Sequence, residues 1–233
     1  MADSWEKLSK DVISCHRCQR LVDWRERVAR EKRRAYMECD YWGKPVPGFG
    51  DEQSEVLVLG LAPGAHGSNR TGRMFTGDAS GDFLFPALHQ AGFCSQAESY
   101  NRNDGLTMKN MFITAVCRCA PPGNKPTREE QLNCREFLLR EIDLFKDLKI
   151  IVALGSIAHN NAFDVMKLLN PEISEKRPKF GHGNEYSHHS DCFYLVDSYH
   201  PSRQNTQTGR LTREMFAQIW ERTNQLLDTL PKP

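Results

Sequence analysis

Four short sequences follow the four apolar runs of this chain, and they contain residue types that can do chemistry: Gly60-Leu-Ala-Pro-Gly64, Cys117-Arg-Cys119-Ala-Pro-Pro, Gly155-Ser156 and His200-Pro-Ser202. Glycine-rich backbone can bind an anion, thiolates can hold a metal, and a histidine can donate a hydrogen bond or a proton. If the runs are parallel strands, the four sequences meet at the edge of the sheet where ligands bind in such folds. We therefore expect a functional site at this edge.

The loop after the first run, residues 56–59, is rich in Gly, Asn, Thr and Arg. Its segment Gly67-Ser-Asn-Arg-Thr-Gly72 has the glycine spacing of a Walker loop, but Arg73 and Met74 follow it. The lysine that binds the phosphates and the hydroxyl that binds Mg²⁺ are both missing, which argues against mononucleotide binding. The backbone amides of the loop can still hold an anion or the edge of a base.

Asp78 ends this loop, just before a helix that we expect to begin between residues 80 and 82. An aspartate in this place is commonly a cap or turn residue, so position alone does not make it catalytic. Asp82 fits the capping role better. The choice between a structural and a catalytic Asp78 stays open at this point.

His200 follows the last apolar run and opens a long polar segment, residues 200–212, which contains Arg203 and Arg210. A single histidine near a strand end is often structural. A polar, arginine-bearing loop beside a strand end is nevertheless suited to binding phosphates, with the histidine as a hydrogen-bond donor.

The chain has eight cysteines and no basic-then-apolar leader, so a metal or cluster site is a better explanation than a disulfide framework. Cys15 and Cys18 form a C-x-x-C pair, and Cys119 and Cys134 form a second pair, although Cys117 competes with Cys119. The spacing does not decide between zinc and an iron–sulfur cluster. The remaining cysteines are expected to be packing residues: Cys39, Cys94 and Cys192. A second metal site is a weaker alternative to an ordinary polar loop for the set His182, His188, His189 and Cys192.

The order of elements predicts one α/β domain, residues 1–233, built as a three-layer αβα sandwich around a central, mainly parallel four-stranded sheet. The apolar runs at residues 56–59, 111–116, 150–154 and 193–196 are the expected strands. Helical patterns lie between them, including a capping box from Thr127 to Glu130 and a helix that Ser156 can cap. Residues 3–35 also look helical and contain the first cysteine pair. The last helix has an apolar face made of Met215, Phe216, Ile219, Trp220, Leu226 and Leu227.

Composition limits the function classes. The 233 residues have a net charge of +1, so a nucleic-acid surface has to be local. Residues 17–34 contain eight Arg or Lys against three acidic residues, a pattern also typical of a solvated helix face. No apolar run approaches the ~20 residues of a membrane span, so we expect no membrane partner. The polar start of the chain predicts a cytoplasmic location, and we expect a monomer.

Two long motifs resemble a known family. Gly60-Leu-Ala-Pro together with residues 69–78 (NRTGRMFTGD) resembles the first motif of the iron–sulfur uracil-DNA glycosylases, and residues 200–212 (HPSRQNTQTGRLT) resemble their last. Within that superfamily the match is to the family 5 (type B) enzymes. Residues 119–126 (CAPPGNKP) and 179–183 (KFGHG) fit the same family, so the resemblance extends from about Cys15 to Thr212.

The resemblance implies a monofunctional DNA glycosylase. It would hydrolyse the N-glycosidic bond of uracil, and of other deaminated bases such as hypoxanthine, and leave an abasic site as the first step of base excision repair. The implied partner is DNA that contains such a base. The implied cofactor is a structural 4Fe-4S cluster, held by Cys15, Cys18, Cys119 and Cys134.

The same resemblance assigns roles around the base. Asp78 corresponds to the proposed catalytic carboxylate, His200 to the donor to the base carbonyl, and Phe75 to the aromatic residue that stacks on the flipped base. Asn124 corresponds to a polar residue of the base pocket. Further substrate contacts are expected from six residues: Gly60, Leu61, Ala62, Ser202, Arg203 and Arg210.

Two positions set this chain apart. Gly64 stands where the family more usually has alanine, and Ala115 stands where a related branch keeps a uracil-reading asparagine, which suggests relaxed base selection. Two other hypotheses remain open: an iron–sulfur DNA-binding protein without glycosylase activity, and a zinc-stabilised nucleotide-binding domain.

Overall fold

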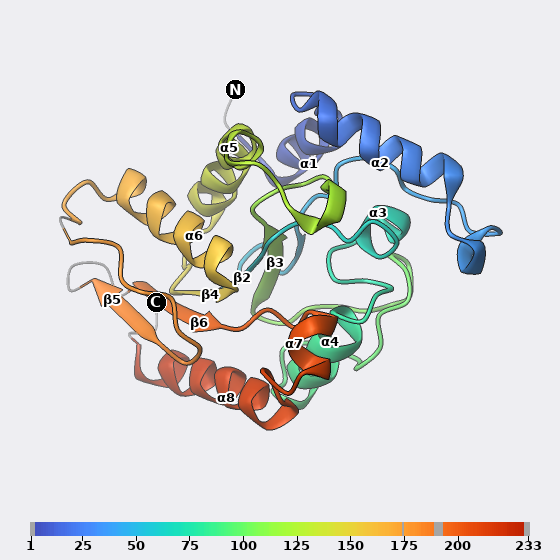
Figure 1. Ribbon diagram of the computed structural model, residues 1–233. Helices are drawn as coiled ribbons and strands as arrows, with labels where there is room; N and C mark the ends of the chain where they lie inside the picture. Colours follow the sequence, from blue (N-terminus) through green and yellow to red (C-terminus); the bar gives the residue numbers. More distant parts are fainter. Residues whose placement is uncertain (1–2, 174, 189–192, 231–233) are drawn as a thin grey trace.

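Four parallel strands form the centre of the sheet, in the order β3-β2-β4-β6. They are β2 (Val56–Gly60), β3 (Met111–Ala115), β4 (Ile150–Leu154) and β6 (Phe193–Ser198). The computed structural model describes residues 3–173, 175–188 and 193–230 (Figure 1). Along β2 alternate side chains enter two different cores, Val56 and Val58 on one face and Leu57 and Leu59 on the other. This double burial explains why the runs are continuously apolar.

Two short antiparallel strands extend this centre, so the described sheet has six strands where the sequence predicted four. β1 (Phe49–Gly50) pairs with β3, and β5 (Glu185–His188) pairs with β6. The parallel centre of the prediction is confirmed. The edge strands were missed because one has two residues in a Gly- and Pro-rich segment and the other is polar, so neither has an apolar run.

Helices cover both faces of the sheet, which confirms the three-layer prediction (Figure 1). On one face lie α1 (Trp5–Ile13), α5 (Arg128–Leu144) and α6 (Ser156–Leu169); on the other lie α4 (Gly81–Gln90) and α8 (Arg213–Thr229). α2 (Gln19–Glu31) packs on the short α3 (Ser68–Thr71) at one end of the molecule. The remaining short helices are η1 (Arg34–Tyr36), η2 (Pro122–Asn124) and α7 (Arg203–Gln207).

The predicted helix starts are mostly confirmed. Thr127 and Glu130 form the capping box of α5, with both reciprocal hydrogen bonds present. The predicted face of α8 is buried at Phe216, Ile219, Trp220 and Leu226. Ser156 is the first residue of α6 and Gly155 its N-cap, so Ser156 does not cap that helix as expected.

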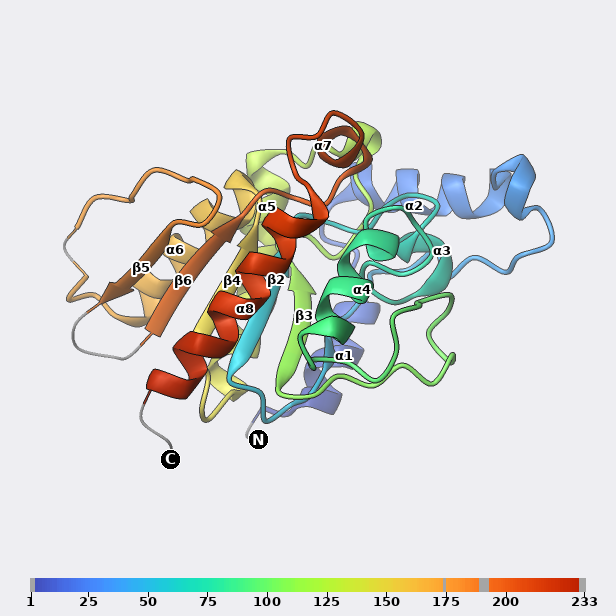
Figure 2. The same ribbon diagram turned by 90° about the horizontal axis from the view of Figure 1, so that it is seen from below.

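The carboxyl ends of the four central strands share one edge, as expected. Figure 2 shows that the arrows of β2, β3 and β6 point toward the same end, where α7 lies. At this edge the Gly155 N–H donates to the Ser198 carbonyl over 2.8 Å, which joins the ends of β4 and β6. The segment that follows β6 is less irregular than predicted, because it forms α7. Within the described chain, no helix is long and apolar enough to cross a membrane.

Candidate active site and cysteine cavity

Asp78 lies at the start of α4 and holds that helix through one of its two carboxylate oxygens. Its Oδ1 accepts the backbone N–H groups of Ser80 (3.0 Å) and Gly81 (3.2 Å). Asp78 therefore satisfies the free amides of the helix start, and the expectation that Asp82 is the better cap is wrong, since Asp82 is exposed in the first turn. Burial raises the pKa of the Asp78 carboxyl, although the two amide hydrogen bonds oppose this shift.

The second oxygen of Asp78, Oδ2, faces two glycines of the loop after β2. A methyl group added at Gly67 would stand 1.9 Å from Oδ2, and one added at Gly64 would stand 2.7 Å from it. The absence of side chains at these positions gives the carboxylate its space. Gly67 is the stricter requirement, because the added atom would also lie 2.6 Å from the Asp78 Cγ.

Phe75 packs over the end of β2 in a strained conformation. Its φ of 53° is in the left-handed region, which a phenylalanine rarely adopts. Its ring lies so close to Gly60 that an added Cβ there would be 2.7 Å from the ring, and its carbonyl crowds Gly81 in the same way. Phe75 is thus held by two close glycine contacts, one against its ring and one against its backbone carbonyl.

His200 packs beside this ring, with the Phe75 and His200 ring centroids 5.8 Å apart and the planes at 30°. Burial lowers the pKa of His200 to about 4, so the imidazole is neutral near pH 7 and can donate one hydrogen. Its backbone carbonyl accepts the Ser202 N–H (2.7 Å) and the Asn205 side-chain amide (2.9 Å). No described group hydrogen-bonds to the ring itself, which leaves its donor available to a ligand.

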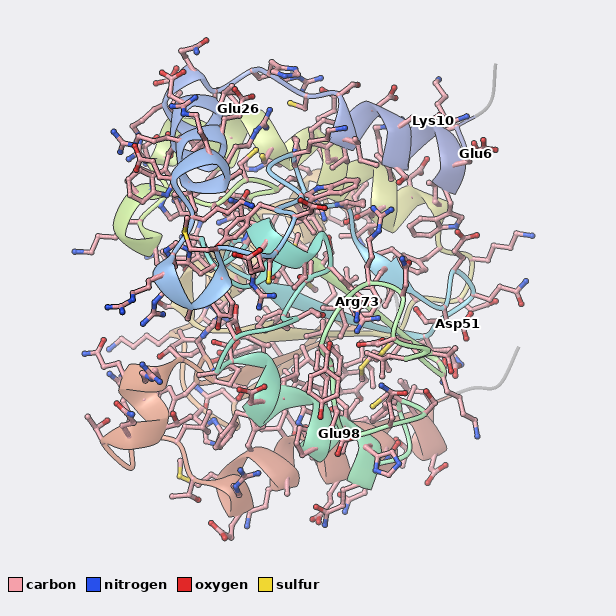
Figure 3. The ribbon with its side chains drawn as sticks, turned by 90° about the vertical axis from the view of Figure 1, so that its right-hand side faces the viewer. Glu6, Lys10, Glu26, Asp51, Arg73 and Glu98 are labelled. Atoms are coloured by element: carbon pink, nitrogen blue, oxygen red, sulfur yellow. The ribbon has the colours of Figure 1, made fainter. Side chains whose placement is uncertain are left out.

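Two arginines of the loop between β2 and α4 stabilise that loop through internal hydrogen bonds and an ion pair, a role that sequence reasoning missed. Arg73 is buried and pairs with Asp104 (2.6 Å) while it also contacts Ser99 and Thr76; Figure 3 shows it well inside the outline of the molecule. Arg70 donates to the carbonyls of His66 (2.8 Å) and Gly77 (2.9 Å). By contrast, Glu6 and Lys10 form an exposed pair on α1 in Figure 3.

The remaining predicted substrate contacts lie around this centre. The carbonyls of Gly60 and Leu61 are paired with the amides of Val116 (3.0 Å) and Cys117 (3.0 Å), and Ala62, which follows them, is partly buried. Asn124 is exposed on η2 with a φ of 57°.

Of the substrate contacts predicted after β6, Ser202 caps a helix, whereas Arg203 and Arg210 are exposed cations. Ser202 caps α7 through its Oγ, which accepts the Asn205 N–H (3.3 Å). Arg203 is exposed on α7, and the exposed Arg210 places its guanidinium 4.6 Å from the centroid of the Tyr199 ring. Arg203 and Arg210 are therefore the solvent-facing cations of this rim.

The four predicted cysteine ligands line one cavity at the base of α2. Cys15 and Cys18 lie between α1 and α2, Cys119 follows β3, and Cys134 is on α5. Leu21, Val22 and Phe137 provide an apolar wall. The four thiols thus come from the N-terminal helices, from the segment after β3 and from α5, and meet around one cavity.

Cys117 does not line this cavity but packs in the same core as Leu57 and Leu59, where its thiol hydrogen-bonds to that of Cys134. Of the other cysteines, Cys94 is buried in the opposite core and Cys39 is partly buried. Cys192 lies outside the described residues, as does His189, so the alternative metal site that includes them is untested. Among the described His, Cys, Asp and Glu side chains, no group of three is placed to hold a single metal ion.

Arg25 belongs to the basic run at residues 17–34, for which a solvated helix face is the ordinary interpretation, but its side chain faces this cavity. Its side chain is 1% exposed, and its Nη1 donates to the Cys119 sulfur over 3.0 Å. A second donor, the Asn133 amide, lies 3.5 Å from the Cys18 sulfur. A buried guanidinium and a partly buried amide aimed at sulfur favour thiolates, which are the form that binds metal. Burial is the larger effect and raises the pKa of the Cys119 thiol to about 12.

Comparison with known proteins agrees with this geometry. The model of the family described as the uracil DNA glycosylase superfamily matches residues 47–224. A type-5 uracil-DNA glycosylase of Thermus thermophilus is 48% identical over 92% of this chain and 94% of its own. One of Mycobacterium leprae is 45% identical over 97% and 96%. A type-4 uracil-DNA glycosylase of Sulfurisphaera tokodaii is 28% identical over 94% and 84%.

The chain therefore belongs to the uracil DNA glycosylase superfamily and, within it, to the type-5 family.

The glycine cradle of Asp78 leads to the first prediction. Gly67→Ala should displace the Asp78 carboxylate and lower the rate of uracil release by about 10²-fold. Small misplacements of reacting groups have effects of this size. Gly64→Ala should have a smaller effect, because its added atom approaches only Oδ2 closely. Single-turnover rates, with circular dichroism and melting curves to confirm folding, make the comparison. A Gly67→Ala variant that is folded and as fast as the wild type would contradict the cradle.

Proposed function

We propose that the protein hydrolyses the N-glycosidic bond of uracil in DNA. The observation that supports this most directly is the juxtaposition of the Phe75 ring and the neutral His200 imidazole in the same site as the desolvated Asp78 carboxylate. The Phe75 ring suits a flat base, the His200 N–H suits a carbonyl oxygen of that base, and the Asp78 carboxylate suits a developing positive charge on the sugar. The relatives named as uracil-DNA glycosylases point to the same substrate.

Base recognition begins with extrusion of the nucleotide, because the bond is inaccessible inside a duplex. The flipped base would stack on Phe75, whose strained backbone holds the ring ready. His200 would donate a hydrogen bond to a base carbonyl, with backbone N–H groups near Leu61 and Ala62 as further donors. Such preorganised donors stabilise the charge that the base acquires as it leaves with the bond electrons.

Asp78 would act on the sugar side of the bond. As the base leaves, C1′ of the sugar acquires oxocarbenium character, which a nearby carboxylate stabilises. Its Oδ2, free of the amide hydrogen bonds that occupy Oδ1, would orient the water that attacks C1′ and accept a proton from it. The departing base takes up a proton, and the products are free uracil and an abasic site.

Exposed cations around the site would hold the DNA backbone. Arg203 and Arg210 are exposed on α7 and just after it, and Arg27, Arg30 and Arg33 are exposed on α2 and just after it. Contacts of this kind position DNA without reading sequence, and their contribution falls as salt rises. Asn124, exposed beyond β3, would contact the base or its neighbour after the duplex docks.

The range of bases would extend to hypoxanthine. Ala115, at the end of β3, pairs in register with Gly60 and offers no side-chain hydrogen bond to select uracil. Removal of deaminated bases is the chemistry that opens base excision repair, and we place the protein at that step.

The four cavity cysteines would hold a 4Fe-4S cluster. The group would supply a structural cross-link between the N-terminal helices and the sheet. The donor set fits it: four thiols line the wall of one largely apolar cavity, and the guanidinium of Arg25 would offset the negative charge of the thiolates. The same arginine reaches the active-site loop, because its carbonyl accepts the Asn69 amide (3.2 Å).

Replacing Asp78 by asparagine tests the proposal. Asp78→Asn should lower uracil release by at least about 10²-fold, the size expected for removing one electrostatic stabiliser, while DNA binding stays within about twofold. The assay uses an end-labelled oligonucleotide with one uracil opposite guanine, cut by hot alkali wherever a base has been lost.

The same variant should unfold no more easily than the wild type. Folding raises the Asp78 pKa, so above that pKa the ionised carboxylate destabilises the folded state; asparagine removes the charge and keeps an oxygen for the helix amides. Asp82→Asn, on the exposed first turn of α4, is the matched control and should keep wild-type activity. A folded wild-type protein that binds DNA but releases no uracil would instead favour a non-catalytic DNA-binding protein.

Cysteine variants test the cluster. Cys119→Ala should remove most of the iron and the broad absorption near about 400 nm, whereas Cys117→Ala, its neighbour in the core, should keep both. Iron and acid-labile sulfide are measured on protein purified without oxygen. The assignment is contradicted if the two variants exchange these results, or if the wild type contains zinc instead of iron.

A further inference from the structure

The motif at residues 179–183 has no part in the function described so far, yet His182 from this motif touches the segment that ends in His200. Its Nδ1 accepts the backbone N–H of Tyr199 over 3.1 Å. The two rings are stacked, with centroids 5.0 Å apart and an interplanar angle of 18°. His182 therefore holds both the backbone and the side chain of the residue directly before His200.

His200 needs such support because its own ring has no hydrogen-bond partner among the described residues. Phe75 packs beside the His200 ring, and the His200 Cβ lies near Gly155. Neither contact is a hydrogen bond to the backbone of residue 200. On the far side, the His200 carbonyl is held by Ser202 and Asn205. His182 supplies the matching hold on the near side, through the Tyr199 amide.

The loop that contains His182 is anchored by a buried contact between His159 and Asp197. Asp197 on β6 accepts from the Gly181 N–H (3.2 Å) and contacts His159 Nδ1 (2.8 Å), and the opposite nitrogen of His159 contacts the Pro178 carbonyl (3.0 Å). Both His159 and Asp197 are fully buried. On the other side of residue 182, the Gly183 N–H donates to the Asp197 carbonyl over 2.8 Å, so the loop is tied to β6 on both sides of His182.

His182 accepts the Tyr199 N–H through Nδ1, so this nitrogen must be unprotonated. Burial lowers the pKa of His182, and a hydrogen bond with the Met215 backbone on α8 opposes the shift. The same stack also steadies the DNA-facing rim, since the Arg210 guanidinium packs on the Tyr199 ring that His182 contacts.

We propose that His182 is the positioning residue for His200, setting the place of the base-facing imidazole through its hydrogen bond to the Tyr199 amide. The proposal rests on the proposed function for its effect on rate, while the positioning itself is a property of the fold. The contact works through an acceptor atom, so a side chain that restores that atom restores the position.

Two variants distinguish the hydrogen bond that His182 Nδ1 accepts from the stacking of its ring on Tyr199. His182→Phe keeps an aromatic ring beside Tyr199 and removes the acceptor; His182→Asn places an amide oxygen near the position of Nδ1 and removes the ring. We expect His182→Phe to lower the single-turnover rate of uracil release about tenfold or more with unchanged DNA affinity, and His182→Asn to recover most of that loss. In a His200→Ala background, His182→Phe should cost nothing further, because the imidazole it positions is gone.

The matched control is Tyr186→Phe. The Tyr186 hydroxyl donates to the Lys179 carbonyl over 2.6 Å, so its loss loosens the same loop without removing the contact to Tyr199. This variant should keep the wild-type rate. An equal loss in Tyr186→Phe and His182→Phe would mean that loop stability alone matters, and would overturn the proposal.

The NMR signals of the His200 ring and the Tyr199 amide report the position without turnover. In His182→Phe the His200 ring signal should move and the Tyr199 amide should exchange faster with solvent, and His182→Asn should return both toward wild type. If the wild type releases no uracil but these signals respond, the proposed function fails and the positioning stands. If His182→Phe leaves rate and signals unchanged, the positioning fails.

Discussion

The desolvated carboxylate of Asp78 is the constraint around which this structure is arranged. One oxygen is fixed by the free amides at the start of α4, and the other faces Gly67 and Gly64, where an added methyl group would stand 1.9 Å and 2.7 Å from it. Burial of a charge is unfavourable, so the loop needs support from elsewhere in the fold. That support comes from the internal arginines Arg70 and Arg73 and from the strained Phe75, whose carbonyl packs against Gly81.

The N-terminal helices extend this support to the cysteine cavity. The carbonyl of Arg25 accepts the Asn69 amide, while its guanidinium donates to the Cys119 sulfur. The connector after α2 adds two backbone hydrogen bonds, from Trp42 to Arg70 and from Gly43 to Asn69. A cross-link in the cavity would therefore stabilise the active-site loop without touching the substrate. This relation would connect the proposed cluster to the proposed glycosylase site within one small domain.

Local patterns made the parallel centre of the sheet and the convergence of its strand ends predictable. Continuous apolar runs, a capping box and the special residues after each strand each act over a few neighbours along the chain. The missed features depend on distant partners. From the sequence Asp82 looks the better helix cap, and only the loop geometry shows that Asp78 is the residue turned toward the amides. Arg25 lies in a run of basic residues, and only the packing of α2 shows that it faces sulfur rather than solvent.

The roles proposed for Asp78 and His200 predict different pH behaviour, so the pH dependence of uracil release under single-turnover conditions tests the account most directly. The carboxylate has to be ionised, so the rate should be constant near neutral pH and fall on acidification, with a midpoint above the ordinary aspartate pKa of 3.8. His200, whose pKa is about 4, stays neutral over the active range. The acidic limb should therefore persist, at a lower rate, in His200→Ala. A limb that disappears in His200→Ala, or one that lies at or below 3.8 in the wild type, would contradict a catalytic, desolvated Asp78.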